Sequence, residues 1–311
     1  MSVQSIINSL EDKHNIDILY MNELGSKAFN LDSNASDHDA YVVFRQPLNE
    51  YAKINGYTQN IMDHKSYDNW DIQGWNIKRF AELMYKSNPT TIEFINSPLK
   101  LYSKNDEFKF LLDDFRNYVI NNVNPIGLYY HYQSLAKKNY EKYIKENWKI
   151  NKEEIEKTNM GKYLDTMNHS PRIIDDNGGV KLSFGRAGSY PIEQAYNRDF
   201  VRKTTTDRTI KRTLFIVRAV CCAKWVKHNK NIPPLDFEVL LNEETYLDKT
   251  VKNEIENIVS KKRNNNNESV GVILPEFIEG ELNTKIDNEK YNKGNLDKDR
   301  VNKFITDTLN L

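Results

Sequence analysis

The feature that most constrains this chain is a Gly-Ser break between two short strand-like runs, the second of which begins with paired aspartates. Residues 16–21 (IDILYM) are rich in branched side chains, which is typical of a strand, and Gly25-Ser26 follows this run. After a polar, turn-like stretch, the segment from Asp37 to Phe44 starts with Asp37-His38-Asp39 and then becomes apolar, which predicts a second strand. This order of elements is hard to obtain by accident in an ordinary core, so it indicates a functional site.

The side chains at this break suit a site for a metal ion and phosphates. A Gly-Ser turn offers backbone N–H groups to an anion without a bulky side chain in the way. The Ser26 hydroxyl adds a donor, and Lys27 adds a nearby cation. Alternate residues of a strand point to the same face, so Asp37 and Asp39 are expected to project together. Two carboxylates on one side form an oxygen-rich pocket for Mg²⁺, which can bridge protein and triphosphate.

A third carboxylate would complete a two-metal site. Residues 70–75 (WDIQGW) form the next strand candidate, and Asp71 lies near its start. Asp63 and Asp68 are the alternatives for this third position. The sequence favours Asp71 because it lies on a predicted strand just before Gly74.

The rest of the chain is mainly helical. Residues 149–207 are expected to form loops or hairpins, and residues 261–267 (KKRNNNN) a turn or a disordered loop. We therefore predict an α+β fold in which a domain with a small mixed sheet, residues 1–104, precedes a mainly α-helical domain, residues 105–311. Apolar residues at helical spacing predict helices over residues 2–13, 76–87, 108–121, 126–148, 208–227, 236–243, 247–260 and 298–311.

These motifs resemble those of the DNA polymerase β superfamily of nucleotidyltransferases. More narrowly, the chain is similar to the branch associated with RNA ligases and RNA repair in bacteria and phages, over residues 20 to about 242. The tail from Lys261 to Leu311 has no recognised counterpart. The matching stretches are Gly25-Ser26-Lys27-Ala28-Phe29, Ser36-Asp37-His38-Asp39, residues 71–80, residues 87–94, His131-Tyr132, Ala136, Asn139-Tyr140, Tyr143, Lys211, Arg218, Ile232-Pro233-Pro234 and Phe237.

The resemblance implies roles for the first set of residues. Asp37, Asp39 and Asp71 would bind Mg²⁺ or Mn²⁺ and act in catalysis, and Gly25-Ser26 would bind the triphosphate of an NTP. The family often has arginine after Gly-Ser, whereas Lys27 keeps the charge without the bidentate fork of arginine. The implied reaction moves a nucleoside monophosphate to an acceptor hydroxyl and releases pyrophosphate.

The predicted helical domain supplies further candidates for nucleotide binding. Lys211 and Arg218 are seven residues apart and share one helix face, which would suit phosphates or the acceptor backbone. His131 and Asn139 lie on the long predicted helix, as nucleobase, ribose or helix-bracing contacts, and Lys138 joins them. For each of these residues, a purely structural or solvated role is the alternative.

The composition of the chain limits the classes of partner that it is expected to bind. Lys+Arg and Asp+Glu both total 44, so the chain is not a general polyanion binder, although residues 198–230 hold ten basic and two acidic residues. We find neither an apolar run long enough to span a bilayer nor a signal peptide, which favours the cytoplasm, or the host cytoplasm for a viral protein. Abundant Asn and Lys suggest an AT-rich genome of a virus or low-GC bacterium. Cys221 and Cys222 are expected to be reduced core residues.

Three functions remain open from the sequence. The first is nucleotidyl transfer to an RNA end, such as a damaged tRNA, with residues 198–230 along the RNA backbone. The second keeps the chemistry but modifies a protein or a small molecule. The third is a non-catalytic module that binds a nucleotide or an RNA end; the acidic pair argues against it, because two neighbouring carboxylates repel each other without a metal.

Overall fold

The computed structural model forms two compact units. The first unit contains residues 1–138 and 209–311, and the second contains residues 139–208. The predicted boundary at residue 104 falls inside the first unit. The structure describes residues 2–54, 56–67, 69–145, 148–161, 171–176, 179–184, 188–203, 209–242, 246–264, 274–291 and 294–311.

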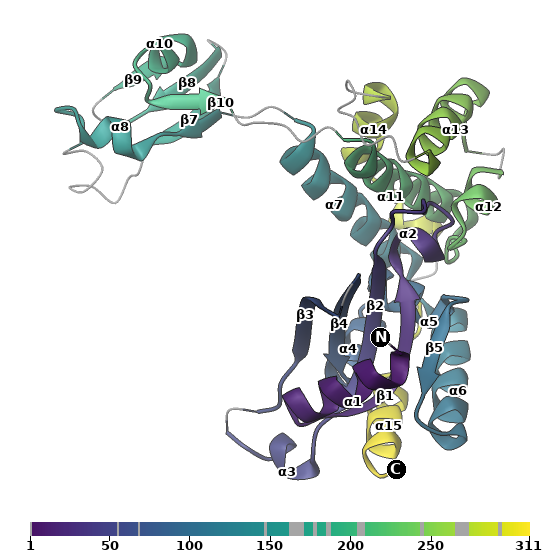
Figure 1. Ribbon diagram of the computed structural model, residues 1–311. Helices are drawn as coiled ribbons and strands as arrows, with labels where there is room; N and C mark the ends of the chain where they lie inside the picture. Colours follow the sequence, from purple (N-terminus) through teal and green to yellow (C-terminus); the bar gives the residue numbers. More distant parts are fainter. Residues whose placement is uncertain are drawn as a thin grey trace. The chain divides into compact units, whose positions relative to one another are not determined.

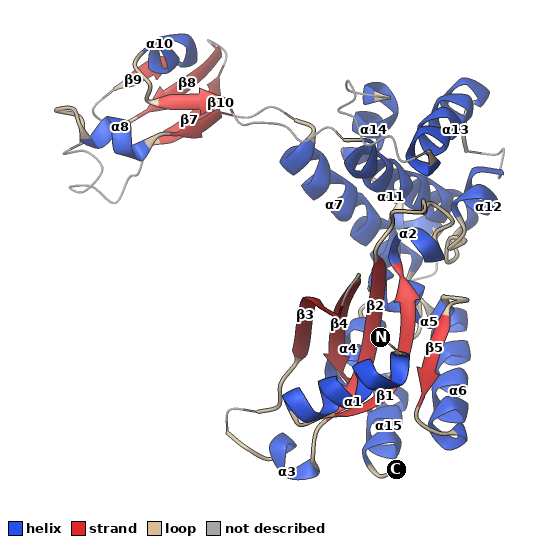
Figure 2. Cartoon of the chain, viewed as in Figure 1, coloured by secondary structure: helices blue, strands red, loops and turns tan. Residues whose placement is uncertain are grey.

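The first unit is built on a mixed sheet of five strands, in the order β3-β4-β2-β1-β5 (Figures 1 and 2). Strands β2 and β4 pair in parallel, and the other neighbours pair antiparallel. The mixed α+β fold predicted from the sequence is confirmed. The strands are β1 (Asp17–Leu24), β2 (His38–Arg45), β3 (Asn60–Tyr67), β4 (Trp70–Asn76) and β5 (Lys100–Ser103).

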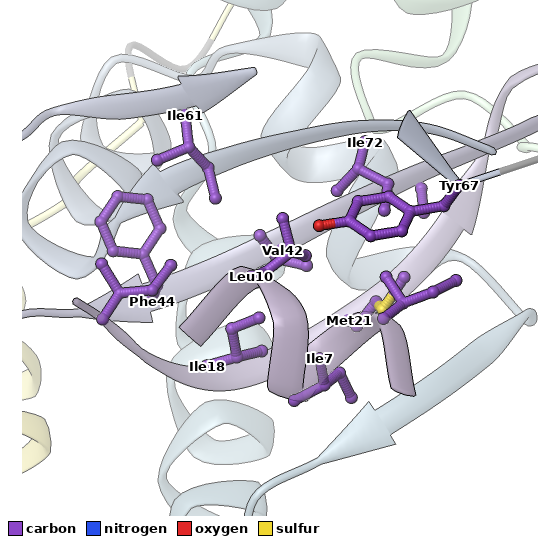
Figure 3. Packing of buried hydrophobic residues seen from close by; sticks show 12 residues of the cluster. Ile7, Leu10, Ile18, Met21, Val42, Phe44, Ile61, Tyr67 and Ile72 are labelled. Atoms are coloured by element: carbon purple, nitrogen blue, oxygen red, sulfur yellow. The ribbon is translucent and has the colours of Figure 1, made fainter. Parts of the chain in front are cut away.

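Helix α1 (Val3–His14) covers one face of the sheet. Its Ile6, Ile7 and Leu10 are fully buried, and Figure 3 shows Ile7 and Leu10 packed on side chains of β1, β2 and β4. Alternation along β2 directs Ala40, Val42 and Phe44 to this face, so the odd-numbered residues of β2 point to the other one.

The opposite face carries an aromatic cluster beneath α4 (Ile77–Tyr85) and α5 (Pro89–Asn96). Tyr41 stacks on Trp75 with ring centroids 5.0 Å apart, and Phe94 meets Trp75 edge to face. Asn88 caps α5 by accepting from the Thr90 and Thr91 amides, and Pro89 suits the first helical turn. This packing holds β4 at Trp75, which shares its face of the sheet with Asp71.

Helices complete the first unit. Helix α11 (Ile210–Asn229) is buried along most of its length, and α12, α13 and α14 pack on it. Cys221 and Cys222 are buried free thiols in α11, as predicted. The remaining helices described here are α2 (Gly25–Ala28), α3 (Leu48–Tyr51), α6 (Asp106–Asn122), α7 (Pro125–Tyr143, which runs into the second unit), α12 (Phe237–Asn242), α13 (Lys249–Arg263), α14 (Pro275–Leu282), the 3-10 turn η2 (Asn288–Lys290) and α15 (Lys298–Leu309).

The C-terminal helix α15 returns to the sheet at the start of the chain. It packs on α4 and α6, and Phe304 stacks on Phe115 with ring centroids 4.0 Å apart. Arg45 of β2 donates to the Thr308 carbonyl at 2.9 Å. The tail that had no recognised counterpart is therefore part of the core of the first unit.

The second unit has its own small core. Leu182, Phe184, Ile192 and Phe200 are buried together in it. The hairpin expected between residues 149 and 207 is present as antiparallel β7 and β8. The elements are β6 (Trp148–Ile150), α8 (Lys152–Glu156), β7 (Arg172–Asp176), β8 (Gly179–Ser183), β9 (Ser189–Pro191), α10 (Ile192–Asn197) and β10 (Val201–Lys203).

Several predicted boundaries were wrong. Trp148 belongs to strand β6, where it pairs with Lys203, and not to the preceding helix. Residues 261–263 continue helix α13, because Ile255, Ile258 and Val259 give that helix a buried face that holds its last turn. Strand β5 and helix α14 were not predicted. Across the described ranges, we find no helix with the length and apolarity to cross a membrane.

Candidate active site

Asp39 and Asp71 lie side by side at one end of the parallel strand pair. Asp39 of β2 is the direct register partner of Asp71 of β4, so the two side chains leave the same face of the sheet. This is the face of Tyr41 and Trp75, beneath α4 and α5. The two partly buried carboxylates therefore come from neighbouring strands with rigid backbones.

Gly25 packs directly against the Asp39 carboxylate. It follows β1, where Leu24 is the register partner of Asp39, and it has a φ of +70°. A Cβ placed on Gly25 would lie 2.0 Å from Asp39 Oδ2. Only glycine therefore fits here, both for its backbone conformation and for the space beside Asp39. The predicted Gly-Ser turn therefore lies directly against Asp39, one member of the predicted acidic pair.

The Asp39 carboxyl lies in a concentrated negative field. Burial raises its pKa, and Asp71, Asp37 and Glu23 raise it further, whereas Lys211 lowers it. Asp37 is exposed, one residue before β2. Among the described residues, no three acidic, histidine or cysteine side chains stand close enough to form a preassembled metal cage. The carboxylates gathered around Asp39 nevertheless form a set of oxygen donors that a divalent cation would stabilise.

Asp63 and Asp68 were the alternatives to Asp71 for the third acid. Asp63 of β3 is the register partner of Ile72, so it points to the α1 face, opposite to Asp71. It is buried there and accepts from Lys13 Nζ at 2.7 Å. Asp68 lies outside the described residues. Of the described candidates, Asp71 is the one that shares a face with Asp39.

The Lys27 side chain contacts His38 and Glu23 at the edge of the candidate site. Its Nζ lies 2.8 Å from His38 Nε2 and 3.6 Å from Glu23 Oε1. His38 Nδ1 lies 2.8 Å from the same Glu23 oxygen, and the His38 ring stacks on Trp70 at 4.2 Å. Since His38 and Asp39 are consecutive in β2, Lys27 reaches the face opposite to Asp39. A phosphate contact by Lys27 would require it to leave this network.

Two lysines from distant helices act electrostatically on the acidic cluster. Lys211 lies at the exposed start of α11 and lowers the pKa of Asp39. Lys262, in the last turn of α13, has its own pKa lowered by burial and by Lys211, and raised by Asp32 and Asp37. The neighbouring Arg263 donates to the Asn30 carbonyl at 2.9 Å, which ties this turn to the loop after α2. Sequence reasoning missed Lys262 because it assigned KKRNNNN to a turn or loop.

Comparison with known proteins shows the family of this chain. A sequence profile of the RNA repair pathway DNA polymerase beta family matches residues 2–307. The chain belongs to this family. It is also similar to the uncharacterized protein YcgL of Bacillus subtilis (strain 168), with 22% identity over 285 residues that cover 90% of this chain and 85% of the relative. Membership suggests nucleotidyl transfer, and the match includes the tail from Lys261 onward.

In this family member, Arg218 is built into the core. The residue is 5% exposed, and its guanidinium pairs with Glu93 Oε1 at 2.9 Å and lies 3.5 Å from the centre of the Phe29 ring. Tyr132 donates to the same Glu93 oxygen at 2.9 Å. Arg218 thus links α11 to α5 and to the end of α2. These contacts support a bracing role, and nucleotide contact by Arg218 stays a prediction.

The other three helical candidates lie on α7. His131 is exposed and its Nε2 lies 3.3 Å from the Lys86 carbonyl, which is a bracing contact at the end of α4. Lys138 is exposed and is the last residue of the first unit; Asn139 is the first of the second unit. The nucleotide roles of these three residues stay predictions.

Proposed function

We propose that this chain is a metal-dependent nucleotidyltransferase that moves a nucleoside monophosphate from an NTP to a hydroxyl at an RNA end. The observation that carries the proposal is the register pairing of Asp39 with Asp71, with Gly25 packed against the Asp39 carboxylate. Two adjacent acids beside a glycine turn suit a reaction in which positioning and charge neutralisation provide most of the rate.

Asp39, Asp71 and Asp37 would hold Mg²⁺ or Mn²⁺. The ion would supply charge neutralisation at the phosphates and activation of the attacking hydroxyl. The crowding of carboxylates around Asp39, which raises its pKa, supports this assignment. The backbone of Gly25-Ser26 would receive the triphosphate, since glycine allows the close approach of an anion.

Lys211 and Lys262 would bind the β- and γ-phosphates of the NTP, which leave as pyrophosphate. Both act electrostatically on the acidic cluster, and they come from helices α11 and α13, which pack on each other. Two cations opposite an acidic, metal-binding edge match the charge of a metal-bound triphosphate.

The RNA acceptor is proposed from membership in an RNA repair family. The predicted basic segment 198–230 is divided, because Arg198 and Arg202 belong to the second unit and the residues from 209 onward to the first. Arg208 lies outside the described residues. The predicted segment is therefore not one continuous basic helix.

The test is incubation of the protein with each of the four labelled NTPs, a total tRNA fraction and Mg²⁺, followed by sequencing of the labelled product. Label on RNA that is lost with a chelator and in the Asp37→Ala/Asp39→Ala variant would support the proposal. A parallel incubation with cell protein tests the alternative acceptor. Label confined to protein, or full activity in the folded double variant, would contradict it.

A further inference from the structure

A strongly basic hollow lies at the C-terminal end of α11, in the first unit. It encloses about 500 Å³ between the last turns of α11 and the segment from residue 285 to 291. Among the described residues, its lining includes Lys224, Lys227, Lys230, Lys285 and Lys290, and one carboxylate, that of Asp287. Such a concave and mostly cationic surface is suited to an anion.

The buried carboxylate of Glu281 organises two of these lysines. Glu281 is 3% exposed, and its Oε2 lies 3.7 Å from Lys224 Nζ and 3.6 Å from Lys227 Nζ. Its other oxygen accepts from the Tyr129 hydroxyl at 2.6 Å. The two ammonium groups are thereby directed toward one point, whereas lysines on an open surface move independently. In the part of the chain that the structure describes, the five lysines of the lining outnumber the two carboxylates of Glu281 and Asp287.

The walls of the hollow are tied together. Tyr291 donates to the Lys227 carbonyl at 2.8 Å, and Lys230 Nζ lies 5.7 Å from the centre of the Tyr291 ring. Lys290 pairs with Asp287 at 3.3 Å. The segment that follows α14 is thus fastened to the end of α11, and the hollow exists before any ligand arrives.

Helix α11 connects this hollow to the proposed active site. Lys211 stands at the acidic cluster and Lys227 lines the hollow. At about 1.5 Å of rise per residue, their separation of sixteen positions places the two roughly 24 Å apart along the helix axis. A single nucleotide does not bridge such a distance. A stacked strand with roughly 3.4 Å per nucleotide would cover it in about seven nucleotides.

We propose that this hollow binds backbone phosphates of the RNA acceptor, upstream of the end that reacts. The inference rests on the proposed function for the identity of the acceptor, and on the hollow itself for the binding of phosphate. It makes RNA affinity depend on strand length, because a strand of about four nucleotides held at the active site ends short of the hollow.

The experiment compares Lys230→Gln/Lys285→Gln with the wild-type protein by fluorescence anisotropy. The probes are labelled RNAs of about 20 and about 4 nucleotides with the same 3′ sequence, titrated at several salt concentrations. These two lysines are exposed and not paired to Glu281, so the buried carboxylate keeps its partners. Lys109→Gln/Lys298→Gln, at exposed positions on α6 and α15, is the matched control for lost charge.

We expect the double variant to bind the long RNA about tenfold more weakly, with a salt slope smaller by about 1 to 2, and to bind the short RNA as the wild type does. The proposal would be overturned if the double variant bound the long RNA with the affinity and salt slope of the wild type, or if it lost the same affinity for both RNAs. It would also be overturned if the variant lost only the binding of inorganic pyrophosphate. Lys285→Glu provides a second variant if the double variant is unstable. Absence of nucleotidyl transfer by the wild type would contradict the proposed function and leave this binding test valid.

Discussion

Gly25 and Asp39 are in such close contact that a single methyl group on the glycine would overlap the carboxylate, 2.0 Å from Oδ2. We expect Gly25→Ala to displace Asp39 and to lower nucleotidyl transfer about 100-fold, since a misplacement of about 1 Å can have that effect. The left-handed backbone, with φ at +70°, adds a loss of stability of about 1–2 kcal/mol. Steady-state kinetics and thermal unfolding measure the two effects separately.

Gly56→Ala is the control for that substitution. Gly56 has a φ of +66°, but a Cβ there would meet nothing within 4 Å. We expect the same loss of stability with unchanged transfer. If both alanine variants lose activity equally, backbone strain explains the result and the contact with Asp39 does not.

The pairing of Asp39 with Asp71 predicts which third acid is required. We expect Asp71→Asn to reduce transfer about 1000-fold, because a carboxylate ligand of a catalytic metal contributes several kcal/mol to transition-state stabilisation. Asp63→Asn removes a carboxylate from the opposite face of the sheet and breaks a contact to Lys13, so it should lower stability and preserve turnover. Turnover per folded molecule, measured for both variants, decides the assignment; a catalytic loss in Asp63→Asn alone would reverse it.

Lys262 tests whether the C-terminal region takes part in substrate binding. We expect Lys262→Gln to raise the KM for NTP about tenfold or more, since a hydrogen bond to a charged group is worth about 1.5–3 kcal/mol. Lys261→Gln changes the exposed neighbour in the same helical turn and should leave KM unchanged. Equal KM values for the two variants would remove Lys262 from the site.

The candidate site residues could be selected from the sequence because their signals are local. Gly25-Ser26, Asp37-x-Asp39 and Asp71 each lie at a recognisable break or strand, and alternation alone predicts which strand residues share a face. The parallel pairing of β2 with β4 is a long-range choice that no local pattern contains. From the sequence, Asp71 was preferred to Asp63 only because of its position in the chain. The register of β4 with β2 and β3 places the two side chains on opposite faces of the sheet.

The helical residues were harder to assign because their environments depend on tertiary packing. Spacing placed Lys211 and Arg218 on one face of a helix, yet Lys211 is exposed and Arg218 is buried against Glu93 and Phe29. Nor did sequence patterns indicate that α15 returns to the sheet, since the contact between Phe115 and Phe304 joins residues almost 200 positions apart. Burial of a charge and pairing of distant segments are properties of the assembled core.

The adjacent thiols of α11 give a prediction about pH. Burial raises the pKa of Cys222 to about 12 and also raises that of Cys221. We expect neither thiol to react with a disulfide reagent in the native protein between pH 7 and 9, and both to react in denaturant. Because the folded pKa of Cys222 is raised, its contribution to stability is complete below pH 9 and is lost between pH 9 and 12. Rapid labelling of the native protein at pH 8 would contradict this.

Substitution of Arg218 tests whether this residue braces the core or contacts the nucleotide. Its removal would leave the Glu93 carboxylate buried beside Tyr132 without its cation, so we expect Arg218→Ala to cost about 3–5 kcal/mol of unfolding free energy. Arg218→Lys keeps the charge but loses the planar group that lies on the Phe29 ring, so it should recover only part of the stability. Calorimetric NTP binding below the unfolding transition separates the two roles. A brace predicts near-normal affinity per folded molecule in Arg218→Lys, whereas a large loss of affinity without a loss of stability would place the guanidinium on the nucleotide.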